Sequence, residues 1–127
     1  MGVRFFSSSS LSLGRYGERL TLVWLWMRGF RILATNWRTH GGEIDIVAMR
    51  WSTLHIVEVK TRSNSRFSPR RAVTRSKQRR LVVATRDFLR KARPQICRIQ
   101  FDVVEVCWWH WFPKIRPIWD AFRVDQI

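Results

Sequence analysis

The chain has few acidic side chains for its length of 127 residues. It contains 9 Asp and Glu against 24 Lys and Arg, a formal net charge of +15. Between Arg62 and Arg98 there are 13 basic residues and a single acid, Asp87. This local excess predicts a polyanionic partner. Nucleic acid is the first candidate and an anionic membrane surface the second, while an Arg-rich solvated surface is the plain alternative.

Cysteine and histidine are also scarce. Cys97 and Cys107 are ten residues apart and form no C-x-x-C motif, and His40, His55 and His110 lack the spacing of metal ligands. These patterns argue against a zinc site and against a disulfide framework. We therefore expect the two cysteines to have only a packing role and the three histidines to be structural or surface residues, in a reducing cytoplasm.

Long apolar runs are absent. The run from Leu20 to Met27 is too short to cross a bilayer and is closed by Arg28. Residues 1–13 are Ser-rich and too polar for the core of a secretory signal. We expect residues 1–13 to be a flexible tail and residues 14–127 to form a single domain with no membrane attachment, since 46% hydrophobic and 26% charged residues are typical of globular proteins.

What the chain does contain is a pair of strand-like apolar runs, Ile44 to Met49 and Leu54 to Val59. Both have the length and the Ile and Val content of buried strands. Residues 50–53 are short enough to close a hairpin between them. In that hairpin position 49 faces position 54, so the numbers of opposite residues always have the same sum.

Three charged residues, Asp45, Glu58 and Lys60, fall on one face of this hairpin, because side chains alternate along a strand. The register places Asp45 opposite Glu58, and Glu43 opposite Lys60. Opposed like charges destabilise a strand pair unless something offsets them, and a divalent cation is the usual means. The alternative is a solvated strand face with Lys60 as a surface ion-pair partner. The surrounding Ile and Val residues predict that both faces are covered, which favours a cleft.

Other patterns predict the flanking elements. Apolar periodicity indicates a helix over residues 15–28 with Gly29 as its C-cap, and a basic helix over residues 76–92 that Pro94 stops. Residues 30–37 and 96–107 read as strands. A helical wheel leaves open whether Glu18 faces solvent or a site. Four Trp residues after position 107 are expected to close a core or an oligomer contact, with stacking on bases as the alternative.

The resulting order of elements carries a set of motifs that resembles the YraN-type family. These are largely uncharacterised bacterial proteins similar to archaeal Holliday-junction resolvases, within the PD-(D/E)xK nucleases. The resemblance covers roughly residues 14–123. The motifs are Gly14-x-x-Gly17-Glu18, Asn36-x-Arg38, Gly42-Glu43-Ile44-Asp45, Val57-Glu58-Val59-Lys60-x-Arg62, Lys77-Gln78, Phe101-Asp102-Val103-Val104 and Trp119-x-Ala121-Phe122. The chain departs from the family in the turn at residues 49–51, in lacking a Gly near residues 67–70, and in its Trp- and Pro-rich tail.

The resemblance implies an α/β fold of the restriction-endonuclease-like type, a mixed central sheet flanked by helices in the order αβββαβ. It also implies Mg²⁺-dependent, or Mn²⁺-dependent, hydrolysis of phosphodiester bonds. Asp45, Glu58 and the backbone carbonyl of Val59 would then be metal ligands. Lys60 would position or activate the attacking water, and Glu18 would complete the catalytic site.

Further residues are expected to support this site. Glu43 is predicted to form an ion pair with Lys60 beside the metal ligands. The predicted phosphate contacts, which carry no base specificity, are Arg62, Arg71, Arg75, Lys77 and Arg79.

Two functions remain open from the sequence. One is a metal-dependent endonuclease acting on structured or branched DNA. The other is a basic nucleic-acid-binding protein without catalytic turnover. Whether the chain forms a homodimer is also left open.

Overall fold

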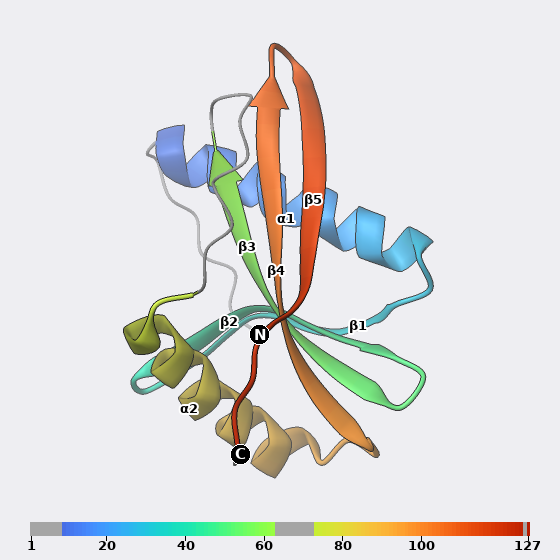
Figure 1. Cartoon of the computed structure of the whole chain (residues 1–127), viewed down its shortest axis with the longest axis vertical. Coiled ribbons are helices and arrows are strands. Elements are labelled where there is room, and N and C mark those ends of the chain that lie inside the picture. Colours follow the sequence, from blue (N-terminus) through green and yellow to red (C-terminus); the bar gives the residue numbers. More distant parts are fainter. Residues whose placement is uncertain (1–8, 63–72, 126) are drawn as a thin grey trace.

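The computed structural model describes residues 9–62, 73–125 and 127. The five strands form one sheet in the order β1-β2-β3-β4-β5, in which only β3 and β4 run parallel. This confirms the expected mixed sheet with flanking helices (Figure 1). The elements are α1 (Ser9–Met27), β1 (Arg31–Thr39), β2 (Gly42–Arg50), β3 (Thr53–Arg62), α2 (Arg75–Ala92), β4 (Arg98–Trp109) and β5 (Phe112–Phe122).

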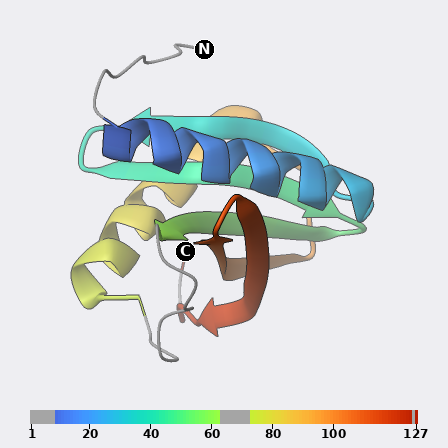
Figure 2. The same cartoon turned by 90° about the horizontal axis from the view of Figure 1, so that it is seen from above.

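The two helices cover opposite faces of the sheet (Figure 2). Leu81, Ala84 and Phe88 of α2 belong to one buried apolar cluster, and Leu25 of α1 belongs to a second cluster on the other face. The central strands are therefore buried on both sides, which explains their nearly continuous Ile and Val runs. Among the described residues, no helix is both long and apolar enough to cross a membrane.

The helix ends follow local sequence signals. Gly29 has a φ of 88°, and the amides of Gly29 and Phe30 donate to the carbonyls of Trp26 and Leu25, each at 3.1 Å. This is the Schellman arrangement, so the expected C-cap is confirmed. Helix α2 ends before Pro94, as predicted.

Helix α1 begins earlier than the sequence predicts. It starts at Ser9, inside the stretch expected to be a flexible tail, and residues 1–8 lie outside the described residues. Once a helix is nucleated, each added residue gains a hydrogen bond at little further entropic cost. The helical turns after Arg15 therefore allow the helix to continue toward the N-terminus, past Gly14 to Ser9.

The expected order of elements omitted one strand. β5 occupies the Trp- and Pro-rich tail, for which the sequence predicted no strand, and it contains Pro113 and Pro117. Both prolines pair with β4, and β5 is the edge strand of the sheet. Proline is tolerated at an edge because its missing N–H faces no further strand.

A buried histidine and carboxylate tie β3 to the last two strands. His55 Nδ1 lies 2.6 Å from Asp102 Oδ2, and both side chains are almost fully buried. The other oxygen of Asp102 accepts hydrogen bonds from the Gln100 side chain at 2.9 Å and from the Asp120 amide at 2.8 Å. Asp120 has a φ of 55° at an irregular point in β5, so Asp102 holds this bend in place.

We expect Asp102→Ala to lower the free energy of unfolding by about 2–4 kcal/mol, because it leaves a buried imidazole and a backbone amide without partners. Urea denaturation followed by circular dichroism would measure this loss. Gln100→Ala is the matched control, with an expected loss of about 1 kcal/mol or less. Equal losses in the two variants would contradict this account.

A second buried carboxylate, Asp87, joins α2 to β1. Its oxygens accept a hydrogen bond from Trp37 Nε1 at 3.1 Å and lie 2.9 Å from the Arg90 guanidinium and 3.3 Å from Lys91 Nζ. Burial alone would raise the pKa of Asp87. Hydrogen bonds from Lys91 and Trp37, together with the charges of Lys91 and Arg90, outweigh burial and lower this pKa below the usual 3.8.

A carboxyl group with a lowered pKa stabilises the fold above its unfolded pKa, and this contribution is lost as the pH falls through the folded pKa. We therefore expect the melting temperature of Asp87→Asn to be lower than that of the native chain at pH 7. The gap should close in acid, below the usual carboxyl pKa. Thermal melts from pH 7 to pH 2 would test this, and a gap that stays constant with pH would contradict it.

Candidate functional site

The candidate site lies where β2 and β3 separate. The two strands pair from Arg50 opposite Thr53 to Ile46 opposite Val57, all in the predicted register. The turn is tighter than expected, because Arg50 and Thr53 are themselves paired. Beyond Ile46 the pairing stops, and Figure 1 shows β2 and β3 diverging from this point. We call this point the fork.

Asp45 is the first residue of β2 inside the fork. Its Oδ2 accepts a hydrogen bond of 2.8 Å from the backbone amide of Val59 on β3. The carboxylate thus satisfies a donor that faces the opening between the strands. Asp45 and Glu58 do not form a regular backbone pair, yet the fork keeps their side chains close enough to interact electrostatically.

The orientation of Asp45 depends on a break in strand alternation. Ile44 and Val47 both belong to the apolar cluster under α2, whereas Ile46 belongs to the cluster under α1. A regular strand would place residues 44 and 46 on the same face. The register of β1 puts Asn36 opposite Asp45, and Asn36 has a φ of 50°. Both strands therefore change phase at the fork.

Glu58 is the most enclosed of the site carboxylates, with 7% of the residue exposed. One of its oxygens, Oε2, lies 3.1 Å from Nζ of Lys77. The other, Oε1, is buried and has no hydrogen-bond partner among the described residues. Lys77 reaches Glu58 from the first turn of α2, where the Thr74 side chain accepts a hydrogen bond from the Lys77 amide at 3.2 Å.

A third carboxylate, Glu18, approaches the fork from α1. Burial raises the pKa of Glu18, a hydrogen bond with the Asn36 side chain opposes this, and the charge of Glu58 raises the pKa further. The pKa of Asp45 is raised well above its usual value by burial and by the charge of Glu58, against the hydrogen bond from Val59. Glu18 therefore faces the site, which the helical wheel left open.

Two glycines let the helices approach the sheet beside the fork. A Cβ atom on Gly42 of β2 would lie 2.5 Å from the carbonyl oxygen of Arg80 in α2. A Cβ atom on Gly17 of α1 would collide with the Thr61 hydroxyl of β3. Both glycines lie within three residues of a site carboxylate, so they set how closely Glu18 and Lys77 can approach.

The expected ion pair between Glu43 and Lys60 is not formed. Glu43 instead lies 3.6 Å from Arg38, 3.8 Å from Lys77 and 3.4 Å from Arg80. The prediction failed because it extended the pairing of β2 and β3 past the fork. Lys60 follows Glu58 on the same face of β3, is partly exposed, and forms no ion pair with a described residue.

A second charged cluster adjoins Lys60. Glu105 of β4 pairs in register with Lys60 and is 1% exposed. Its carboxylate forms ion pairs with Arg62, at 3.4 Å, and with Arg116 of β5. Sequence reasoning missed Glu105 and Arg116, because it assigned no strand to the residues that bring Arg116 alongside β4.

The predicted phosphate contacts differ in whether their side chains are exposed or contact a carboxylate. Arg75 and Arg79 are exposed on α2, and Arg62 holds Glu105. Lys77 points instead to Glu58 and Glu43. Arg71 lies outside the described residues.

The donor set of the fork fits a hard divalent cation only partly. The described portion of the chain contains no group of three or more His, Cys, Asp or Glu side chains arranged to hold a metal ion. The half-buried Asp45 and the buried Glu58 nevertheless form a pair of like charges, and Glu58 Oε1 has no partner among the described residues. Mg²⁺ is commonly held by one or two carboxylates and keeps several waters. Asp45 and Glu58 are therefore a fitting pair of ligands.

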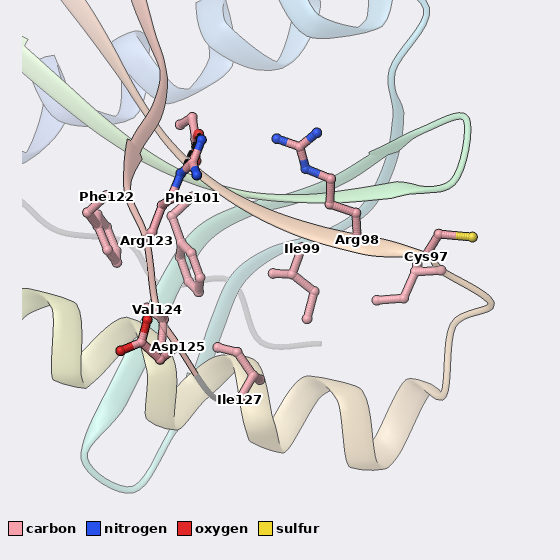
Figure 3. A pocket seen from close by; sticks show the side chains of 11 residues that line it. Cys97, Arg98, Ile99, Phe101, Phe122, Arg123, Val124, Asp125 and Ile127 are labelled. Carbon is pink, nitrogen blue, oxygen red and sulfur yellow. Dashed lines mark hydrogen bonds and ion pairs between the residues drawn. The ribbon is translucent and has the colours of Figure 1, made fainter.

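A hollow of about 690 Å³ lies elsewhere, between the start of β4 and the C-terminal residues (Figure 3). It is lined by Arg98 and Ile99, which pair with the first residues of β3. Glu58 and Lys60 lie toward the other end of β3. The hollow is thus separate from the fork.

The fold and the fork define a class of α/β protein, one with a mixed five-stranded sheet between two helices and an acidic site where two strands separate. This architecture is compatible with the restriction-endonuclease-like fold. The model of the uncharacterised protein family UPF0102 matches residues 17–106. The chain belongs to this family, as the YraN-type resemblance predicted.

Relatives with the same family name occur in distant bacteria. A UPF0102 protein of Rhodococcus opacus is 39% identical over 115 residues, covering 89% of this chain and 98% of the relative. One from Geobacter metallireducens is 40% identical, covering 89% and 93%. One from Clostridium perfringens is 41% identical over 96 residues, covering 75% and 79%. The matched family segment includes Glu18, Asp45, Glu58 and Lys60.

A raised carboxyl pKa means that the charged form destabilises the fold at neutral pH. We therefore expect Asp45→Asn to raise the free energy of unfolding at pH 7, by up to about 1 kcal/mol, because the amide oxygen still accepts from Val59 while the charge is gone. Urea denaturation in metal-free buffer would measure the change. Asp125→Asn, at an exposed acid, is the control and should have little effect. A loss of stability in Asp45→Asn would contradict this prediction.

Proposed function

We propose that this protein is a metal-dependent endonuclease that hydrolyses phosphodiester bonds in structured or branched DNA. The observation that carries the proposal is the fork, where the side chain of Asp45 lies against the charge of Glu58 and one buried carboxylate oxygen of Glu58 has no hydrogen-bond partner among the described residues. Strained charge pairs of this kind are typical of functional sites. Lys77 offsets part of this charge, and a bound divalent cation would offset the rest.

In this proposal Asp45 and Glu58 hold Mg²⁺ or Mn²⁺, with the Val59 carbonyl as a further ligand. The ion, when bound, supplies Lewis acidity to a phosphate oxygen and a more acidic bound water. Lys60 is available to orient the attacking water or to offset negative charge, because it forms no ion pair with a described residue. Glu18 contributes a third negative group from the opposite side of the fork.

The basic surface supports a DNA partner. Exposed arginines of α2 include Arg75, Arg79, Arg86 and Arg90. Helix α2 carries these charges directly beside the fork, because Lys77 of the same helix contacts Glu58. Contacts of this type hold phosphates without reading bases. The backbone of a DNA strand would thus be drawn toward the carboxylates.

A second function, nucleic-acid binding without turnover, is favoured by one observation. Lys77 already lies 3.1 Å from Glu58 and offsets some of the charge that a metal ion would offset. In that case the carboxylates are structural and the basic surface alone acts. Its DNA affinity would fall steeply with salt and would not depend on Mg²⁺.

The deciding experiment combines metal binding and cleavage. Calorimetric titration with Mg²⁺ or Mn²⁺ should show binding that Asp45→Ala and Glu58→Ala abolish. On a panel of branched, nicked and single-stranded DNAs, Asp45→Ala should lose cleavage by about a hundredfold or more, since a catalytic metal supplies several kcal/mol. Its DNA affinity should stay equal or rise, because a negative charge is removed.

Asp125→Ala serves as the control, because this acid is exposed and distant in sequence from the fork. It should retain both metal binding and cleavage. A native chain that binds DNA but neither binds the metal ions nor cleaves, with DNA present or absent, would reject the nuclease and leave the binding function.

A further inference from the structure

The last two strands extend beyond the rest of the sheet as a two-stranded arm. Arg62, the end of β3, pairs with Cys107 of β4. Past that pair β4 and β5 continue together, through Trp108 opposite Pro113 and Trp109 opposite Phe112. Figure 1 shows this arm projecting past the end of β3. We use the term arm tip for residues 110–112.

The arm tip exposes two aromatic side chains. Trp111 is 81% exposed and Phe112 is 57% exposed, and their ring centroids lie 5.3 Å apart at an interplanar angle of 40°. Neither side chain belongs to the apolar clusters under the helices. Large aromatic surfaces left in water at the end of a projecting hairpin indicate an interaction site.

The charge around the arm favours an anionic partner. Residues 106–119 contain Lys114 and Arg116 and no acid, and Arg116 is paired with Glu105 of the neighbouring β4. Lys114 is exposed and pairs in register with Cys107, at the base of the arm. Flat apolar rings beside positive charges match the two components of a single nucleic-acid strand, its bases and its phosphates.

The arm also lies at a suitable distance from the fork. Lys60 is level with Glu105, and β4 continues four residues further, about 13 Å, to Trp109, where the turn that carries Trp111 begins. That length corresponds to about four nucleotides at the usual spacing of about 3.4 Å. A DNA strand with its backbone at the fork can therefore reach the arm tip.

We propose that the arm tip stacks on unpaired bases where duplex DNA is interrupted by a splayed end, a gap or a branch. This inference rests on the proposed function, because it assumes that DNA is the substrate. A fully paired duplex offers no unstacked base to Trp111 and Phe112. The arm would thus direct the fork of the protein toward interrupted DNA, whereas the arginines of α2 bind any backbone.

A second copy of the chain is a weaker occupant. A buried aromatic side chain contributes about 150–250 Å², so two of them supply at most about 500 Å². A stable interface needs about 800 Å² from each partner. The exposed area of the arm tip is better matched by one or two nucleobases.

The test measures DNA binding by the full chain in EDTA, which prevents cleavage. One DNA is a duplex whose end is splayed into two single strands, and it carries 2-aminopurine at the junction. The other is a fully paired duplex of equal length, with 2-aminopurine at its centre. Trp111→Ala should weaken binding to the splayed DNA about tenfold or more and change duplex binding by less than about twofold. Trp111→Phe should retain most of the native affinity and of the 2-aminopurine quenching at the junction.

Trp51→Ala is the matched control. Trp51 is 89% exposed in the turn that precedes β3, whereas Lys60 lies near the other end of β3. Its removal should leave both affinities unchanged. Equal affinity of Trp111→Ala and the native chain for splayed DNA would overturn the inference, as would an equal loss on both DNAs. A native dimer that Trp111→Ala dissociates in sedimentation experiments would overturn it in favour of self-association.

These outcomes are separable from failure of the proposed function. If Asp45→Ala abolishes cleavage while Trp111→Ala binds splayed DNA normally, only the arm inference fails. If the native chain binds DNA but neither binds metal ions nor cleaves, the nuclease fails and the arm can still be scored by binding. If the native chain binds neither DNA, both fail.

Discussion

The hydrogen bond between the Val59 amide and the Asp45 carboxylate is the interaction on which the site depends. Strands β2 and β3 separate at this position, and the amide of Val59 would otherwise face the gap without a backbone acceptor. A buried amide needs a partner. Because a carboxylate fills that role, an acidic side chain is fixed inside the sheet at a place where strands normally bring only backbone groups together. The other site residues are arranged around this fixed acid.

The charges at the fork differ in sign from those on the surface of α2 beside it. Three carboxylates, from α1, β2 and β3, repel one another across the fork, and Lys77 is the ammonium that lies nearest to Glu58. Arg75, Arg79 and Arg86 of α2 are exposed. The protein therefore combines a surface that attracts polyanions with a small interior region of opposite sign, and the boundary between them runs along the first turn of α2.

Much of this arrangement could be predicted from the sequence, because it depends on local patterns. The register of β2 and β3 followed from two apolar runs and a short turn, and it holds as far as Ile46 opposite Val57. Asp45 and Glu58 lie just beyond the last pair, so they are not paired as predicted but still interact electrostatically. The same reasoning failed for Glu43, because β2 and β3 separate beyond Ile46, sooner than they would in a regular hairpin. No local signal marks the phase change opposite Asn36, which depends on contacts with both helices. The sequence marked Lys77 as a phosphate contact and not as the partner of Glu58, since only the start of α2 determines which basic residue reaches Glu58.

Gly17 and Gly42 give the site a property that its charged residues do not have. Each glycine sits where a helix backbone or a strand side chain leaves no room for a Cβ atom, one on either side of the fork. The distances of α1 and α2 from the sheet therefore depend on the absence of a side chain at these two positions. A substitution of Ala for either glycine would therefore disturb the geometry of the site without changing any acidic or basic residue. A sequence comparison that considered only the charged residues would still assign a complete site to a homologue with this substitution.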